Sequence, residues 1–139
     1  MTTWQILILV GCVLVMDTVI VGAVLAATGA QWKRFATYFP ERPVLAGAQR
    51  RTWQTVRLGV WNWGWSFTIS VDAQCVHLTP GPRIGKLMGG CTASIPVEAL
   101  GQTETGAGGA AKPRRRSGRI KLKLAGRSIE LPSWVMPGV

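Results

Sequence analysis

The residues best suited to chemistry are the single histidine and the cysteines on either side of it. Cys75 and His77 have the same parity, so on a strand both side chains would face one side, and Cys91 could approach them. Three such ligands could hold zinc. However, Cys-x-His lacks the Cys-x-x-Cys spacing of known zinc frameworks, and His77 is the only histidine. We therefore predict no metal site.

Catalysis by His77 as a general base would need a Ser or Cys nucleophile and an orienting acid. Nothing in the spacing singles out either partner. The glycine-rich segment 85–90 lacks the Gly-Lys-Ser/Thr order of a phosphate-binding loop, and the dinucleotide motif GxGxxG is absent. The sequence thus predicts no enzyme, no catalytic residue and no cofactor.

Net charge points to an anionic neighbour. Among 139 residues, 16 Lys and Arg stand against 6 Asp and Glu, a formal charge of +10. A dense basic run consists of Lys112, Arg114, Arg115, Arg116 and Arg119. Beside an anionic leaflet each of these charges would add about 1 kcal/mol of attraction, although such a run is often only a solvated loop. No aromatic residues interleave with it, so nucleic acid is not an expected partner.

The elements that must position these residues begin with a membrane-spanning segment. Residues 4–27 contain no Lys or Arg and are long enough to cross a hydrocarbon core of about 30 Å as a helix. No basic region precedes the apolar run, which is longer than a signal peptide core of about 15 residues. We expect residues 1–30 to be a permanent transmembrane helix.

Two features of this helix predict contacts with other membrane helices. Small residues recur on one face at Gly11, Thr18, Gly22, Ala26 and Gly29, and such ridges let a second helix approach closely. Asp17 lies near the middle of the span, where a carboxylate costs about 2.5–3.5 kcal/mol on insertion scales. A polar contact within a helix assembly would lower that cost. The frequency of Gly and Ala in membrane helices is an equal explanation of the ridge.

Flanking charge predicts the orientation of the chain. No basic residue precedes the span, whereas Lys33, Arg34, Arg42, Arg50 and Arg51 follow it. The positive-inside rule then places the N-terminus outside and the remaining chain in the cytoplasm, in a bacterial inner membrane. The cysteines Cys75 and Cys91 are too sparse for a disulfide framework, which agrees with a reducing compartment, although one bridge between them stays open.

Residues 31–40 have the pattern of a short amphipathic helix. Its apolar positions recur at i, i+3, i+4 and i+7, and Pro40 should end it. We expect it to lie along the membrane surface, although packing on the soluble domain is nearly as favoured. The residues expected at the membrane interface are Trp4, Trp32, Lys33, Arg34, Phe35 and Phe39.

The remainder, residues 41–139, has the pattern of a small β domain. Apolar and polar residues alternate strictly from Trp61 to Asp72, and a charged hairpin covers residues 119–131. A shorter strand precedes residue 61, others lie near 76–78 and 94–100, and residues 101–118 are expected to be a flexible basic loop. The fold class is one N-terminal transmembrane helix and about six antiparallel strands in a curled sheet or partial barrel.

Three motifs carry a resemblance to known modules. The run VxxxxVHLTP at residues 71–80, SIPVEAL at residues 94–100 and the charged hairpin resemble bacterial pleckstrin-homology-like and GRAM-like modules. The segment from Trp32 to Pro40 resembles the opening of small uncharacterised membrane-anchored bacterial proteins. The resemblance covers about residues 32–131. It implies a binding or scaffolding module without catalytic residues.

Tryptophan is unusually frequent in this chain. Trp61, Trp63 and Trp65 share one parity and are most simply core residues. Three such rings exceed what a thin sheet buries with ease, so an exposed aromatic surface for lipid or a partner is an equal alternative.

These observations favour a non-catalytic, single-pass accessory subunit of a larger membrane complex, docking through its helix and its β domain. We expect the complex to be a photosynthetic or respiratory one, because such assemblies often contain small subunits of this kind; no residue of the sequence indicates it. The expected partners are other membrane subunits, anionic lipids, and bound pigments or lipids of the host. The alternative is an autonomous membrane-anchored module that binds anionic lipid headgroups through its basic loop.

Overall fold

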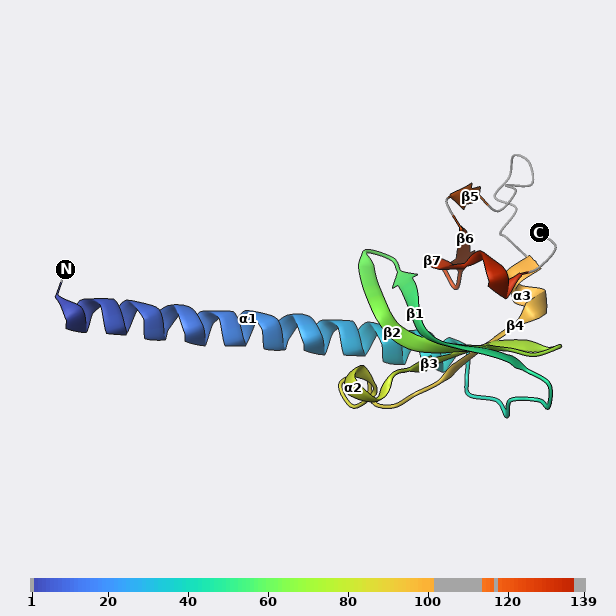
Figure 1. The fold of residues 1–139 in the computed structure, drawn as a ribbon, viewed down its shortest axis with the longest axis horizontal. Helices are drawn as coiled ribbons and strands as arrows, with labels where there is room; N and C mark the ends of the chain where they lie inside the picture. The colour runs from blue at the N-terminus through green and yellow to red at the C-terminus, as the bar shows by residue number, and fades with distance from the viewer. Residues whose placement is uncertain (1, 102–113, 117, 137–139) are drawn as a thin grey trace.

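The structure, a computed structural model, describes residues 2–101, 114–116 and 118–136. One long helix, α1 (Thr3–Tyr38), projects from a small antiparallel β domain (Figure 1). The sheet has seven strands in the order β4-β3-β2-β1-β7-β6-β5, and it curls into a half-barrel. This architecture confirms the predicted fold class.

Helix α1 is the one described helix that is long and apolar enough to cross a membrane, and no other described residue buries its apolar window. It continues without a break through residues 31–38, so a separate helix lying along the membrane surface is wrong. The helix is uninterrupted because the chain has no proline before Pro40. Its last turns gain their stability by packing on the sheet. The alternative weighed for this segment, packing on the β domain, is what the structure has.

Strands β1 (Gln49–Leu58) and β2 (Trp61–Val71) form a long hairpin. Its two-residue turn is Gly59-Val60, in which Gly59 has a φ of 61° that only glycine adopts freely. The alternation from Trp61 onward is confirmed as a strand. Strand β1 is longer than the short strand expected before residue 61, because Gln49, Arg50 and Arg51 pair with the end of β2.

The hairpin bends sharply at two bulges (Figure 1). The pairing register shifts between Arg51 and Gln54 and again between Gln54 and Val56. Trp53 and Trp65 lie at these irregularities with φ values of 56° and 53°, in the left-handed region that large side chains rarely adopt. Bulges increase local twist, and here they turn the end of β1 towards β7 so that the sheet curls.

The other strands complete the half-barrel. Strand β3 (Cys75–Pro80) pairs with β2 and with the edge strand β4 (Ala93–Pro96), and the short helices α2 (Pro82–Gly85) and α3 (Val97–Gly101) follow β3 and β4. Strand β7 (Arg127–Pro132) pairs with both β1 and β6 (Arg119–Leu124), and the 3-10 helix η1 (Ser133–Val135) follows it. The hairpin expected over residues 119–131 is therefore confirmed.

Strand β5 (Arg114–Arg116) lies within the segment expected to be a flexible loop. It pairs in antiparallel fashion with β6, Arg115 standing opposite Ile120. The loop prediction is wrong for these three residues, because they complete a hairpin at the open edge of β6. Residues 102–113 and 117, which include Lys112, lie outside the described residues.

The core fills the concave face of the sheet and is closed by the last turns of α1. Trp32 and Phe35 are 1% and 0% exposed, and the Trp32 ring meets Phe67 of β2 edge to face at 4.9 Å. The indole N–H of Trp32 donates to the carbonyl oxygen of Cys91 at 2.9 Å. The membrane-interface assignment of Trp32 and Phe35 is therefore wrong. Their apolar stripe is covered by the sheet, because a curled sheet this small needs a helix to close its core.

Candidate functional site

A buried Asp–His–Ser network joins three separate segments of the β domain. His77 on β3 stands opposite Ser94 on β4 in the strand register, and Asp72 lies in the turn between β2 and β3. His77 Nδ1 lies 2.9 Å from Ser94 Oγ, and His77 Nε2 lies 2.9 Å from Asp72 Oδ2. His77 and Ser94 are each 1% exposed. These are the residue types of a hydrolase triad, although no spacing in the sequence brings them together.

Backbone donors surround the network and account for its geometry. The carboxylate of Asp72 accepts backbone N–H groups of Leu45, Gln74 and Cys75 at 3.1, 2.8 and 2.7 Å. Ser94 Oγ accepts the N–H of Arg42 at 2.9 Å. The bond from His77, with these backbone donors, holds the pKa of Asp72 far below its usual range.

The network therefore acts as a clamp between the connection 40–48 and the sheet. If Ser94 Oγ–H donates to His77 Nδ1 and His77 Nε2–H donates to Asp72, the hydroxyl proton and the ring proton are both bonded. Ser94 Oγ is enclosed and already bonded on two sides, so an attack by it on a substrate carbonyl would require β4 and the connection to separate.

The residues considered as zinc ligands, Cys75, His77 and Cys91, do not form a metal site among the described residues. Both ring nitrogens of His77 bond to Asp72 and Ser94, and the thiol of Cys91 lies 3.3 Å from the carbonyl oxygen of Gly89. Among the described residues no group of three or more His, Cys, Asp and Glu lies close enough to hold a metal ion. Cys75 and Cys91 are free, Cys75 being buried.

The tryptophan cluster divides between core and surface. Trp63 packs partly against the core, 6.4 Å from the Phe67 ring, and Trp61 is half-buried. Trp65 is 74% exposed, because its bulge turns the side chain away from the core. Together with the exposed Trp53 it lines a shallow depression of about 440 Å³. The sequence pattern around Trp53 does not indicate that this side chain is exposed. The core prediction thus holds in part for Trp63, whereas Trp65 is exposed and an interface role for it stays a prediction.

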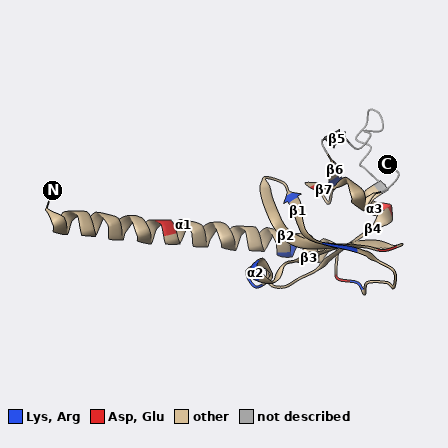
Figure 2. Ribbon diagram, viewed as in Figure 1, with Lys and Arg blue, Asp and Glu red and all other residues tan. Residues whose placement is uncertain are grey.

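Most residues proposed for helix contacts lie on the uncovered part of α1, namely Gly11, Asp17, Thr18, Gly22 and Ala26, whereas Gly29 is buried. A Cβ atom added at Gly11 or Gly22 would meet nothing within 4 Å. The Thr18 hydroxyl donates to the carbonyl oxygen of Leu14 at 2.8 Å, so its own helix satisfies it. Figure 2 shows a single acidic position along the α1 span, Asp17, and no described part of the β domain covers it. Ala26 is exposed as well.

The side of the β domain that faces back along α1 is basic. Figure 2 shows basic positions on α2 and on the end of α1 that lies against the domain. The exposed ones are Lys33, Arg34, Arg83 and Lys86. Two exposed apolar side chains project from the same side, Val60 at the β1–β2 turn and Leu87 after α2. The expected interface residue Trp4 is exposed at the far end of α1, and Phe39 is half-buried against the core.

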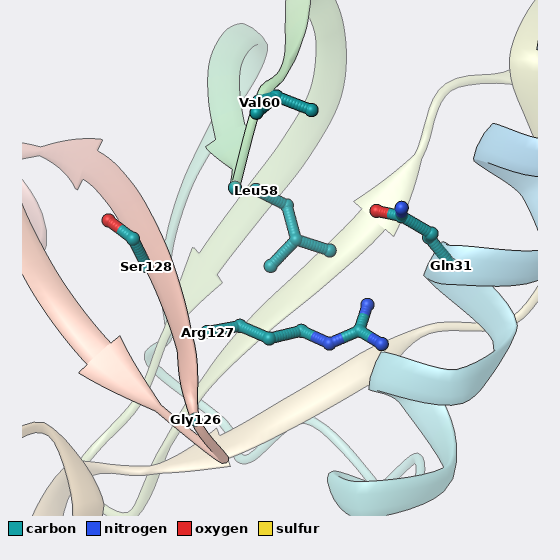
Figure 3. A pocket seen from close by; sticks show the side chains of 7 residues that line it. Gln31, Leu58, Val60, Gly126, Arg127 and Ser128 are labelled. Carbon is teal, nitrogen blue, oxygen red and sulfur yellow. The ribbon is translucent and has the colours of Figure 1, made fainter.

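A small open pocket, called the cavity below, lies between α1 and two hairpin tips on this side (Figure 3). Its volume is about 290 Å³. It is lined by Gln31 of α1, by the β1–β2 tip and by the β6–β7 tip, namely Leu58, Gly59, Val60, Gly126, Arg127 and Ser128. The Arg127 side chain extends across the cavity towards α1 and Gln31 (Figure 3).

Comparisons with known protein families, with curated proteins and with solved structures found no match for this chain. The resemblance to pleckstrin-homology-like modules stays a prediction.

Proposed function

We propose that this protein is a non-catalytic, single-pass accessory subunit that binds another membrane protein through α1 and the side of its β domain that faces the bilayer. The observation that carries the proposal is the position of Asp17. It stands in the middle of an apolar helix that nothing in the described chain covers. A carboxyl group at that depth is unfavourable by about 2.5–3.5 kcal/mol unless a partner donor or a polar cavity meets it.

The face of α1 that carries Asp17 supports a partner that contacts both parts of the chain. Asp17 and Phe35 are separated by about five helical turns, so they lie on one face of a straight helix. Phe35 is the centre of the contact between α1 and the sheet. A helix packed along the Asp17 face would therefore approach the overhanging β domain at its end.

The ridge of small residues offers a second contact face. Gly11, Gly22 and Gly29 are spaced close to whole turns, and Gly29 lies against the backbone of Leu87. A partner helix in the ridge would then end beside the segment after α2. Small residues favour such close backbone approach in lipid, where no hydrophobic effect drives association.

The experiment is purification of the tagged full chain in a mild detergent, with mass spectrometry of the chains that accompany it. Asp17→Leu should reduce the partner by about three- to tenfold, the value of one interhelical polar contact. Gly22→Leu should reduce it by blocking close approach. Met16→Leu and Ala23→Leu are the matched controls at exposed neighbouring positions. Wild-type recovery of the partner with both Asp17→Leu and Gly22→Leu would reject the contact faces.

The same proposal places the β domain in the cytoplasm and the N-terminus outside. Its support is the absence of basic residues before the span and their abundance after it. Cysteines introduced at the exposed Thr2 and Ala73 would report the side by reaction with a membrane-impermeant maleimide. We expect Thr2→Cys to react in intact cells and Ala73→Cys only after lysis. The reverse pattern would overturn the orientation.

A further inference from the structure

We propose that the cavity between α1 and the two hairpin tips binds the phosphate of one anionic phospholipid from the leaflet that α1 crosses. The inference goes beyond the subunit role, because it concerns the chain alone in a bilayer. It combines the depth of the cavity along α1, the polarity of its lining and the charge around it.

The depth follows from the length of the helix. With Trp4 at one interface, a hydrocarbon core of about 30 Å uses about 20 residues of helix and ends near residues 23–27. A headgroup layer adds about 5–7 Å, or about four residues. Gln31, which lines the cavity, thus lies at the level of the headgroups. Gly29 lies at the same level and marks the contact of α1 with the β domain, since a Cβ atom added there would be 2.8 Å from the Leu87 carbonyl oxygen.

The lining matches a lipid phosphate and the upper part of its chains. Arg127, Gln31 and Ser128 contribute polar side chains, and Leu58 and Val60 contribute apolar ones. A guanidinium binds phosphate with two parallel N–H bonds, which makes Arg127 the principal ligand group. No ion pair among the described residues engages Arg127.

The surrounding surface favours an anionic lipid. The basic side chains of Lys33, Arg83 and Lys86 are exposed on the same side of the domain, and Lys33 Nζ lies 3.3 Å from the position that a Cβ atom would take at Gly89. Each such charge attracts an anionic leaflet by about 1 kcal/mol. Val60 is 82% exposed and Leu87 52% exposed, which suits side chains that reach into the acyl boundary.

This site differs from the basic run first considered for lipid contact. Strand β5, which holds Arg114–Arg116, lies away from α1, whereas the β1–β2 tip and α2 extend back along it (Figure 1). The hairpin tips therefore meet the headgroups before the basic run does.

The test uses the full chain in nanodiscs of phosphatidylcholine mixed with phosphatidylglycerol, with native mass spectrometry of the lipid that leaves with the protein. We expect the wild-type chain to retain phosphatidylglycerol above its bulk proportion. Arg127→Ala should reduce this enrichment by about tenfold, the value of a charge-assisted hydrogen-bonded pair. Gln31→Leu tests the other wall without altering the β domain. Arg50→Ala, at the opposite end of β1, is the matched control and should leave the enrichment unchanged.

Three outcomes would overturn the proposal. They are a wild-type chain without enrichment, a folded Arg127→Ala chain with wild-type enrichment, and an equal loss in Arg50→Ala, which would indicate charge without a site. Inorganic phosphate added to the nanodiscs should not displace the lipid; displacement would make the cavity a general phosphate site. Because no partner protein is present, failure here leaves the subunit proposal untouched, and success does not depend on it.

Discussion

The Nε2 atom of His77 lies 2.9 Å from Oδ2 of Asp72, with both side chains almost wholly buried. This contact is the main cause that lowers the pKa of Asp72, and backbone donors from Leu45, Cys75 and Gln74 add to it. A carboxyl group whose pKa is lower in the folded than in the unfolded chain stabilises the fold in its ionised form. Its contribution is complete above the ordinary Asp pKa of about 4 and is lost as the pH falls below that value towards the folded pKa.

The first prediction is an acid-sensitive step in stability that belongs to Asp72. The free energy of unfolding of the wild-type β domain should fall on acidification below about pH 4. Asp72→Asn should lower stability at pH 7 by about 1–3 kcal/mol and flatten the acid step. Denaturant titrations followed by tryptophan fluorescence would measure both. Glu98→Gln, an exposed carboxylate, is the control. An unchanged acid step in Asp72→Asn would assign it to other groups.

The second prediction concerns the clamp on the connection 40–48. Ser94→Ala leaves the Arg42 N–H and one ring nitrogen of His77 without their partner, at a cost of about 1–3 kcal/mol. Hydrogen exchange at the Arg42 and Leu45 amides should speed up, since the connection opens more often. The control is Ser66→Ala, which removes a hydroxyl that donates to the nearby Gly64 carbonyl oxygen and should change stability by less than about 0.5 kcal/mol. Unaltered exchange at Arg42 in Ser94→Ala would contradict the clamp.

The sequence could predict features that depend on local periodicity. The alternation of Trp61 to Val71 and of Ile120 to Leu124 specifies strands, because a side-chain period of two occurs only on extended backbone. The stripe of Trp32 and Phe35 specifies a helix face in the same way. It cannot say whether lipid or a sheet covers that face, since both are apolar, and this is why the membrane-interface assignment failed.

Features set by long-range register lay beyond the sequence. His77 meets Ser94 because β3 and β4 pair in one particular register across the 81–92 connection, and a slip of one residue would turn the serine away. Trp65 shares the parity of Trp63 and Phe67, yet the bulge exposes it. The β1 bulge around Trp53 contains no glycine and leaves no signature in composition, whereas the β2 irregularity between Trp63 and Phe67 contains Gly64. The basic side of the domain likewise assembles from α1, α2 and a hairpin tip that are distant in sequence.

The third prediction tests the strained backbone at Trp65. A side chain with φ near 53° costs about 1–2 kcal/mol relative to glycine, and Trp65 buries little in return. Trp65→Gly should therefore keep or raise the melting temperature of the domain. Trp63→Gly removes a ring that packs on the core and should lower stability by about 3 kcal/mol or more. If Trp65→Gly is as destabilising as Trp63→Gly, the exposed ring has a packing role that this geometry lacks.

The fourth prediction concerns the close approach of α1 to the segment after α2. A Cβ added at Gly29 would lie 2.8 Å from the carbonyl oxygen of Leu87, a backbone atom that cannot move alone. Gly29→Ala should lower the stability of the β domain by about 1–3 kcal/mol and raise the exposure of Trp32. Gly22→Ala, where the added atom meets nothing, should leave domain stability unchanged. Equal effects of the two changes on unfolding would mean that helix propensity, not packing, sets the outcome.

The last prediction tests whether the helix face and the β domain act on one partner. One alanine inserted after Val24, in the uncovered part of α1, rotates Asp17 by about 100° relative to Phe35 and lengthens the helix by only about 1.5 Å. Four inserted alanines restore the face to within about 40° but move the domain by about 6 Å. If the partner meets both surfaces, co-purification should fall with either insertion, because each breaks one of the two alignments. If the single alanine leaves recovery of the partner unchanged, only one of the two surfaces binds. Asp17→Leu then identifies that surface. Loss of the partner assigns binding to α1, and retention of the partner assigns it to the β domain.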